Sequence, residues 1–184
     1  MPKVVRDELG LIAGSKVMFV RMPDGRYSLI PRTGRISDVF GAVPVESSLS
    51  LEEMDAIVRD GNIILRAVLG DDAIQSSLAR QASGDRTPES PAFITGISLA
   101  EVFWVLRSRV GREAALGILR RLVESESMEF DDGEGVVRAL AFADAGADFA
   151  DALIHGTMEQ FGASTTVTFD RRASEHLGWR LLGA

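Results

Sequence analysis

The chain has 184 residues, 46% of them hydrophobic, which suffices for one domain or one and a half with a packed core. The absence of cysteine excludes disulfides and thiolate metal sites and fits a cytoplasmic protein, and neither a membrane span nor a signal peptide is expected. Residues 1–36 carry seven basic and three acidic residues and the remainder carries 13 and 24, so a basic head precedes an acidic body that would repel a polyanion without metal ions.

The basic head begins with a predicted short helix over residues 2–10, with Pro2 in the first turn and Gly10 after the end. The runs KVMFVRM and RYSLI alternate loosely around Pro23-Asp24-Gly25, which predicts a hairpin. Residues 33–50 are rich in Gly, Pro and Ser and are typical of a linker. A helix and one hairpin bury little apolar surface, so we expect the head to need a partner or a second copy.

The middle of the chain carries helix signals. Ser50 followed by Glu53 is a capping-box pattern that predicts a helix over about residues 51–60, with Gly61 as its C-cap. The apolar run IILRAVLG predicts a second helix after this glycine. The acidic pair DD at residues 71–72 predicts the cap of a third helix, through about residue 82.

From residue 92 onwards strands alternate with helices. The predicted strands are AFIT, a weak SMEF, a β-branched TTVTF of the buried parallel type, and WRLL. The predicted helices span residues 98–109, apolar on most faces and hence buried, then 112–124, 133–146 and 148–162. This alternation predicts an α/β fold with a parallel sheet flanked by helices, in which ligands bind at the carboxyl ends of the strands.

Four acidic residues in these elements are candidates for chemistry: Glu101, Asp148, Asp151 and Asp170. Taken singly, each has an ordinary interpretation as a helix cap, a capping-box partner of Ser98 or a turn residue. Taken together, Asp148 and Asp151 face one side of a helix start, and burying an unpaired carboxylate in FADALI costs several kcal/mol. A shared Mg²⁺ or Mn²⁺ would resolve this, since carboxylates favour hard ions and the two histidines lie far apart in sequence.

Residues 62–184 resemble the PIN domain of VapC-type toxins through NIILRAVLGDD, ISLAEVFWVLRS, GADFADALIHG and TVTFDRRA, in family order and spacing. The resemblance implies a parallel sheet flanked by helices and RNA cleavage with Mg²⁺ or Mn²⁺. It places Glu101, Asp151 and Asp170 in the acidic cluster, with Asp148 as an additional member. The family's Asp-Thr-Asn corresponds to residues 60–62, so Asp60 takes the first ligand position. If residues 50–60 are helical, a central strand is missing.

The head is similar to the AbrB-type DNA-binding domain of VapB antitoxins through PKVVRDELGLIAGSKVMFVRMPDGRYSLIPR, although the strand that normally precedes PK is absent. The stretch SLSLEEMDAIVRDG resembles the helical tail of such an antitoxin, which often places an arginine in the toxin's acidic pocket. The resemblance implies Lys3 and Arg6 as DNA-binding residues. It makes Arg32, Arg35 and Arg59 candidates for the inhibitory arginine, and each is otherwise ordinary solvated surface.

The predicted organisation is an antitoxin DNA-binding remnant at residues 1–36, a linker and helical tail at 37–61, and a PIN-like ribonuclease domain at 62–184. The first functional hypothesis is a metal-dependent endoribonuclease of a type II toxin–antitoxin system. Its expected partners are RNA, a cognate or self-associated antitoxin segment, operator DNA and further copies of the chain, with no membrane. The second hypothesis is a catalytically silent fusion that acts through assembly or operator binding. Phe103 and Trp104 are expected to be core residues rather than platforms for base stacking, and His155 to be a partly buried helix histidine rather than part of the site.

Overall fold

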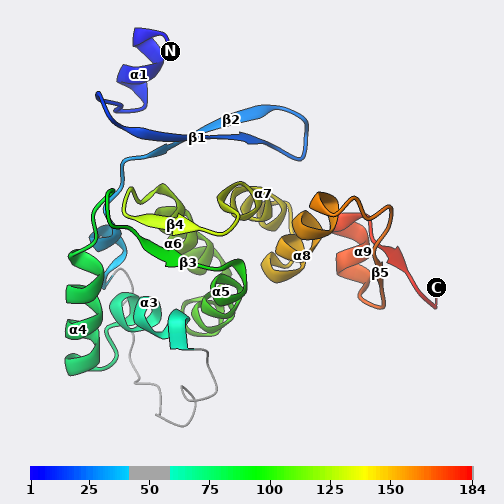
Figure 1. The fold of residues 1–184 in the computed structure, drawn as a ribbon. Helices are drawn as coiled ribbons and strands as arrows, with labels where there is room; N and C mark the ends of the chain where they lie inside the picture. The colour runs from blue at the N-terminus through cyan, green and yellow to red at the C-terminus, as the bar shows by residue number, and fades with distance from the viewer. Residues whose placement is uncertain (42–58, 184) are drawn as a thin grey trace. The chain divides into compact units, whose positions relative to one another are not determined.

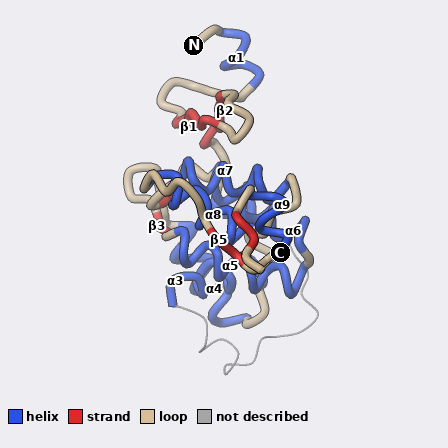
Figure 2. The backbone as a smooth tube through the Cα atoms, turned by 90° about the vertical axis from the view of Figure 1, so that its right-hand side faces the viewer, coloured by secondary structure: helices blue, strands red, loops and turns tan. Residues whose placement is uncertain are grey.

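The structure is a computed structural model that describes residues 1–41 and 59–183. The chain forms two compact units: the first contains Met1–Met18 and Leu29–Asp131, and the second contains Phe19–Ser28 and Asp132–Ala184. Helices dominate the backbone and the strands are short (Figure 2). Within the described ranges, no helix is long and apolar enough to cross a membrane.

The N-terminal elements form as predicted. Helix α1 spans Lys3–Glu8 and buries none of its residues. Strands β1 (Lys16–Arg21) and β2 (Tyr27–Arg32) form a two-stranded sheet, and the Met22 N–H donates to the Arg26 carbonyl at 2.7 Å to close the hairpin turn. Gly25 permits this turn because its φ of 83° lies in the left-handed region that glycine adopts readily.

The segment after the hairpin packs against the rest of the first unit. The 3-10 helix η1 (Ile36–Val39) buries both of its terminal residues, which are 5% and 0% exposed. Gly34 forms a parallel bridge with Ser125, because its N–H donates to the Glu124 carbonyl and its carbonyl accepts from the Glu126 N–H, both at 3.0 Å. The linker prediction is therefore wrong for residues 33–41, where two apolar side chains find a core; residues 42–50 lie outside the described ranges.

Helix α3 (Arg59–Leu69) runs through Gly61 without a break, so the prediction that this glycine ends one helix and separates it from the next is wrong. The reason is packing against helix α5 (Gly96–Val110). A Cβ added at Gly61 would lie 3.1 Å from Val102 Cγ2 and 3.6 Å from the Ser98 carbonyl oxygen. Glycine therefore allows the two helices to approach closely. The predicted capping box at residues 50–53 lies outside the described residues.

The neighbouring residues Asp71 and Asp72 have different structural roles. Asp72 caps helix α4 (Ala73–Gly84) as predicted, with its Oδ1 accepting from the N–H groups of Ile74 and Gln75. Asp71 instead pairs with Arg66 of α3 at 2.8 Å, and the two side chains are only 1% and 6% exposed. The end of α3 is thus fixed by a buried ion pair.

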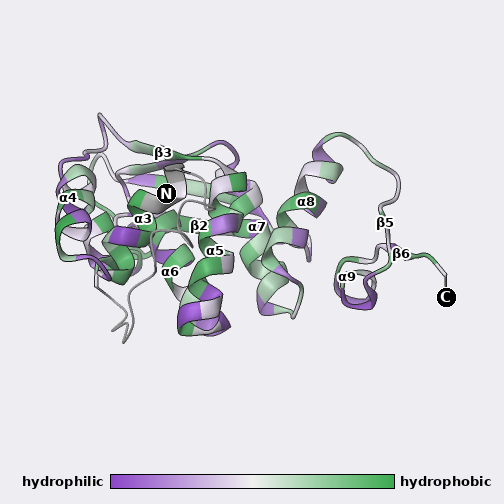
Figure 3. Ribbon diagram, turned by 90° about the horizontal axis from the view of Figure 1, so that it is seen from below, coloured by the Kyte–Doolittle hydropathy of each residue, from purple (hydrophilic) through white to green (hydrophobic). Residues whose placement is uncertain are grey.

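The core of the first unit lies among α3, α5 and α6 (Arg112–Glu124), which lie side by side (Figure 1). Figure 3 shows hydrophobic residues along most of α5. The largest fully buried side chains here are Leu65, Leu99, Phe103, Leu106, Leu116, Leu119 and Leu122. Strands β3 (Ala92–Ile94) and β4 (Met128–Phe130) pair in parallel, with Phe93 opposite Glu129.

The second unit contains helices α7 (Gly133–Asp144), α8 (Phe149–Gln160) and α9 (Arg171–Leu177). Helices α7 and α8 pack on each other as consecutive helices. The connection turns at Gly146, whose φ is +108° and where an added Cβ would lie 2.7 Å from His176 Cε1. Both the backbone angle and the space therefore require glycine at this predicted break.

Strands β5 (Val167–Thr168) and β6 (Arg180–Leu181) form a second parallel pair. The described chain is thus a mixed α/β protein with small parallel sheets, as predicted. The expectation that TTVTF is a buried strand is wrong, since β5 has two residues, Val167 is 48% exposed and Phe169 is 81% exposed. Its pairing with one short neighbour leaves both side chains uncovered.

Candidate functional site

Three of the predicted acids lie in the second unit at the starts of helices. Asp148 caps α8, with its Oδ1 accepting from the Ala150 N–H at 2.9 Å, and Asp151 stands in the first turn of the same helix. Asp170 follows β5 and caps α9, with its Oδ1 accepting from the Arg172 N–H at 2.7 Å. The capping interpretation is therefore confirmed for Asp148, whereas Asp170, interpreted as a turn residue, also caps a helix.

These three carboxylates also act on one another. Burial raises the pKa of Asp151 above its ordinary value, and the negative charges of Asp148 and Asp170 raise it further. Like charges near a partly buried carboxyl disfavour its ionised form, so the group would be stabilised by a nearby cation. Within the described ranges, however, no three His, Asp or Glu side chains stand close enough together to hold a metal ion. The second unit supplies a negatively charged group rather than a finished site.

Glu101 lies in α5 of the first unit, and its interpretation as a capping-box partner is wrong. The N-cap of α5 is Thr95, whose Oγ1 accepts from the Ser98 N–H at 3.2 Å, so the helix begins earlier than Ser98. The Oε2 atom of Glu101 is buried and has no hydrogen-bond partner among the described residues. A buried polar atom without a partner costs about 1–3 kcal/mol. A carboxylate oxygen in this state fits a cation ligand.

Asp60 lies in the first turn of α3, on a helix and not at the end of a strand. Its side chain is outside the described part of the structure, as is that of Arg59. The proposed first-ligand position of Asp60 therefore stays a prediction, now with a helical backbone. Each acid is placed within its own unit: Asp60 and Glu101 in the first, and the three aspartates in the second.

Arg32, a candidate inhibitory arginine, is buried in the first unit. Its Nη1 pairs with Glu129 Oε2 at 3.0 Å, and its Nε and Nη2 donate to the Ser125 carbonyl at 3.3 and 3.0 Å. Lys16 Nζ pairs with the other oxygen of Glu129 at 3.0 Å. Burial opposes ionisation of Glu129, but hydrogen bonds and charge from Lys16 and Arg32 lower its pKa overall. The hairpin is thus anchored to β4 and the turn before it.

The remaining basic candidates lie on the surface. Lys3 and Arg6 are exposed on α1, and Arg35 is exposed beside η1, where its backbone N–H donates to Asp38 Oδ2 at 3.2 Å. Exposed basic side chains on a short helix are compatible with contacts to phosphate. Their proposed roles in DNA binding and inhibition stay predictions.

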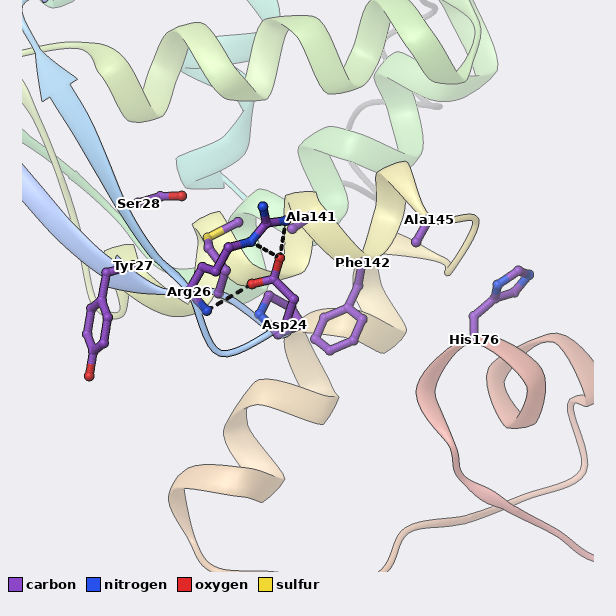
Figure 4. Close-up of a pocket in the computed structure, with 10 residues that line it drawn as sticks. Asp24, Arg26, Tyr27, Ser28, Ala141, Phe142, Ala145 and His176 are labelled. Atoms are coloured by element: carbon purple, nitrogen blue, oxygen red, sulfur yellow. Dashed lines mark hydrogen bonds and ion pairs between the residues drawn. The ribbon is translucent and has the colours of Figure 1, made fainter.

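A cavity of about 680 Å³ lies within the second unit and contains none of the predicted acids. The hairpin turn lines one side and Phe142 of α7 another, with His176 at the far end (Figure 4). Arg26 donates to Asp24 through its backbone N–H at 3.0 Å and through its guanidinium, and this lowers the pKa of Asp24. The two charges compensate each other, so the cavity offers no unbalanced acid to a metal.

The singled-out aromatic and histidine residues divide into two kinds. Phe103 is 2% exposed and belongs to the core as expected. Trp104 is 70% exposed, so the expectation that it is a core residue is wrong, and α5 is not buried on all sides. His155 is structural: its Nδ1 accepts from the Trp179 Nε1–H at 3.0 Å, and its ring meets Phe142 edge-on at 5.1 Å.

Two residues that no sequence motif indicates organise the first unit. Glu129 holds both Lys16 and Arg32, and the buried Ser125 accepts from Arg32 through its backbone. The signal for Glu129 was its position as the charged residue in the short apolar strand SMEF. No side-chain pattern could reveal Ser125, because its carbonyl and not its hydroxyl makes the contact.

Comparison with protein families gives one match: the family model described as the PIN domain covers residues 57–176, more than half of the chain. Comparison with curated proteins and with solved structures gave no significant match. The match contains the whole of α3 and four of the predicted site residues: Glu101, Asp148, Asp151 and Asp170. It begins after the hairpin and η1.

Proposed function

The chain belongs to the PIN-domain family, and from this premise we propose that it is a metal-dependent endoribonuclease of the VapC toxin type. In this proposal residues 1–61 descend from a VapB-type antitoxin with an AbrB-like DNA-binding head. The substrate is RNA and the reaction is hydrolysis of a phosphodiester. The observation that carries the proposal is the placement of Asp148, Asp151 and Asp170 in one unit, where burial and then the charges of Asp148 and Asp170 raise the pKa of Asp151.

The chemistry of the acids fits a hard divalent cation. All of the proposed ligands are carboxylates, which suit Mg²⁺ or Mn²⁺. The buried and unpartnered Oε2 of Glu101 is the kind of atom that such an ion would satisfy. We propose that Glu101, Asp151 and Asp170 hold the ion, with Asp148 and Asp60 as further ligands. When bound, the ion would lower the pKa of a bound water and offset phosphate charge.

The protein's own groups have distinct tasks in this proposal. Asp148 and Asp170 each use Oδ1 to cap a helix, which fixes the orientation of their carboxyl groups. Asp151 stands in the first turn of α8, where burial and then the charges of Asp148 and Asp170 raise its pKa. The helix N-termini of α8 and α9 add positive potential for an anionic substrate.

The N-terminal segment supports the antitoxin part of the proposal. An antitoxin acts by lying against its toxin, and here η1 (Ile36–Val39) lies against α4 and α6 of the PIN-like body. Arg32 is the anchor of this contact; Arg35 and Arg59 are proposed to face the acidic pocket. Lys3 and Arg6 are proposed to contact operator DNA when two copies of the chain associate. A separate cognate antitoxin would be a competing partner for the same body.

One observation favours a second function, that of a catalytically silent binding protein. Asp60 lies in helix α3, whereas the family resemblance implies that a strand ends at this residue. Without that carboxylate the metal site has one ligand fewer. In this alternative the chain acts through assembly or weak operator binding, with the antitoxin segment docked permanently.

The decisive experiment is cleavage of single-stranded RNA by the full chain in Mg²⁺, compared with the same reaction in EDTA. We expect cleavage in Mg²⁺ alone, and its loss in Asp151→Asn and Asp170→Asn. The matched control is Asp72→Asn, since Asp72 also caps a helix through its Oδ1 but is not part of the acidic group. Asparagine caps helices about as well as aspartate, so Asp170→Asn and Asp72→Asn differ mainly in the charge they remove from the site.

Equal cleavage by the parent and by Asp151→Asn would show that a contaminating nuclease is responsible. Failure of the parent to cleave any RNA, with Mg²⁺ or Mn²⁺, would favour the silent binding protein. Binding of fluorescently labelled operator-like DNA by the parent but not by a Lys3→Ala and Arg6→Ala double variant would then support operator binding.

A further inference from the structure

Helix α5 presents a solvent-facing side on either side of Glu101, which is itself half-buried with its Oε2 atom covered. Ile97, Glu101, Trp104 and Arg107 follow one another at spacings of four, three and three residues, which places their side chains in one row. Ile97 is 76% exposed, Trp104 is 70% exposed, and Arg107 is also exposed. The opposite side of α5 supplies the core with Leu99, Val102, Phe103 and Leu106.

The two tryptophans of the chain are placed differently. Trp179 is 8% exposed and donates its Nε1–H to His155. Trp104 is largely exposed, although a tryptophan can bury about 150–250 Å² when it has a partner surface. An indole held outward on a rigid helix, one turn from a proposed catalytic carboxylate, is suited to stack on a flat ligand.

Charge identifies that ligand. Residues 37–184 carry 13 basic and 24 acidic residues, yet Arg107, Arg109 and Arg112 fall together where α5 ends and α6 begins. The row therefore runs from a half-buried carboxylate through an exposed indole to the exposed Arg107, with Arg109 and Arg112 close by in sequence. A single-stranded nucleic acid offers phosphates that arginines attract and unpaired bases that stack on aromatic rings.

We propose that Trp104 stacks on an unpaired base of single-stranded RNA beside the phosphodiester that is cut, with Arg107 attracting a neighbouring phosphate. This inference rests on the proposed nuclease function and adds a residue that selects unpaired RNA. Base stacking tolerates every base, so Trp104 favours single strands over duplexes and does not read a particular sequence. Ile97 provides apolar contact on the other side of Glu101.

The test measures binding apart from cleavage. Anisotropy of a fluorescein-labelled single-stranded RNA is followed in EDTA for the parent, Trp104→Leu and Trp104→Phe. We expect Trp104→Leu to weaken binding about 5- to 150-fold, the range for the loss of one stacked base. Trp104→Phe keeps an aromatic face and should recover most of the affinity. The control is Phe93→Leu, which removes another aromatic side chain of the same unit, 64% exposed, on β3.

A second readout is the emission of Trp104 itself, which RNA should quench in the parent but which is absent in Trp104→Phe. Three results would overturn the inference: no RNA binding by the parent, equal binding by the parent and Trp104→Leu, or equal losses in Trp104→Leu and Phe93→Leu. A change in sedimentation of Trp104→Leu with unchanged RNA affinity would instead assign this face to a second copy. Failure of the nuclease proposal is seen separately, as absence of cleavage by the parent in Mg²⁺.

Discussion

Replacing Arg32 by alanine should loosen the N-terminal segment from the PIN-like body. Arg32 is 6% exposed and makes three contacts: one with Glu129 and two with the Ser125 carbonyl. The alanine variant removes all three contacts. The Ser125 carbonyl then loses both donors from Arg32, although Ser125 is completely buried. The change therefore tests the anchor directly.

The magnitude follows from these contacts. An orphaned buried acceptor costs about 1–3 kcal/mol. The ion pair adds about 1 kcal/mol at most, because the Glu129 side chain is 37% exposed and keeps Lys16 as a partner. We expect Arg32→Ala to lower the free energy of unfolding of the first unit by about 1–4 kcal/mol.

The assay is urea unfolding combined with hydrogen exchange of the Gly34 and Glu126 amides, which donate to carbonyls across the Gly34–Ser125 bridge. Both amides should exchange faster in Arg32→Ala. Arg26→Ala is the control. The Arg26 side chain is 84% exposed and pairs with Asp24, so its loss should leave the exchange rates of both amides unchanged.

The difference between the parent and Arg32→Ala should also depend on pH. Arg32 helps to lower the pKa of Glu129 below its ordinary value of 4.5, so its contribution is present above pH 4.5. That contribution is lost as the pH falls through the lowered pKa. Unchanged amide exchange and unchanged urea midpoint at pH 7 would refute the claim that Arg32 anchors the segment.

Two further predictions concern charges inside each unit. Asp71→Ala should lower the free energy of unfolding in urea by about 3–5 kcal/mol, because it leaves the charge of the buried Arg66 uncompensated. Asp72→Ala should lower it by about 1 kcal/mol, because it removes a helix cap. Equal losses in the two variants would contradict this. Asp151→Asn, measured without metal, should gain stability over the parent as the pH rises above 3.8 and show no gain below it, because the raised pKa makes the native carboxyl harder to ionise. A variant less stable than the parent at pH 7 would contradict that reasoning.

Local signals predicted much of the fold. The helix over residues 112–124 has the predicted bounds, and Asp72 and Asp148 cap helices as their residue types indicate. These features depend on neighbours in sequence, namely apolar periodicity and side-chain acceptors for the first N–H groups. The parallel pairing of β5 with β6 also followed from the alternation of strands with helices.

Errors arose where tertiary contact overrides local preference. Gly61 looks like a helix end, but its missing side chain serves the contact between α3 and α5. Trp104 and Val167 look like core residues because they are apolar, and neither finds a covering surface in its unit. For the candidate site, sequence indicated the acids and their helix starts. It could not indicate the effect of Asp148 and Asp170 on Asp151, which requires distances through space.

The bridge between Gly34 and Ser125 has a consequence for the relative amounts of the docked N-terminal segment and the surface that binds it. Because the docked segment and the surface that receives it belong to one chain, they are always present in equal amounts, and dilution does not separate them. A tethered segment experiences an effective concentration on the order of millimolar, far above that of a free partner in a cell. Two independently made proteins can be unbalanced by degrading one of them. This chain can lose its docked segment only by opening the contact or by being cut.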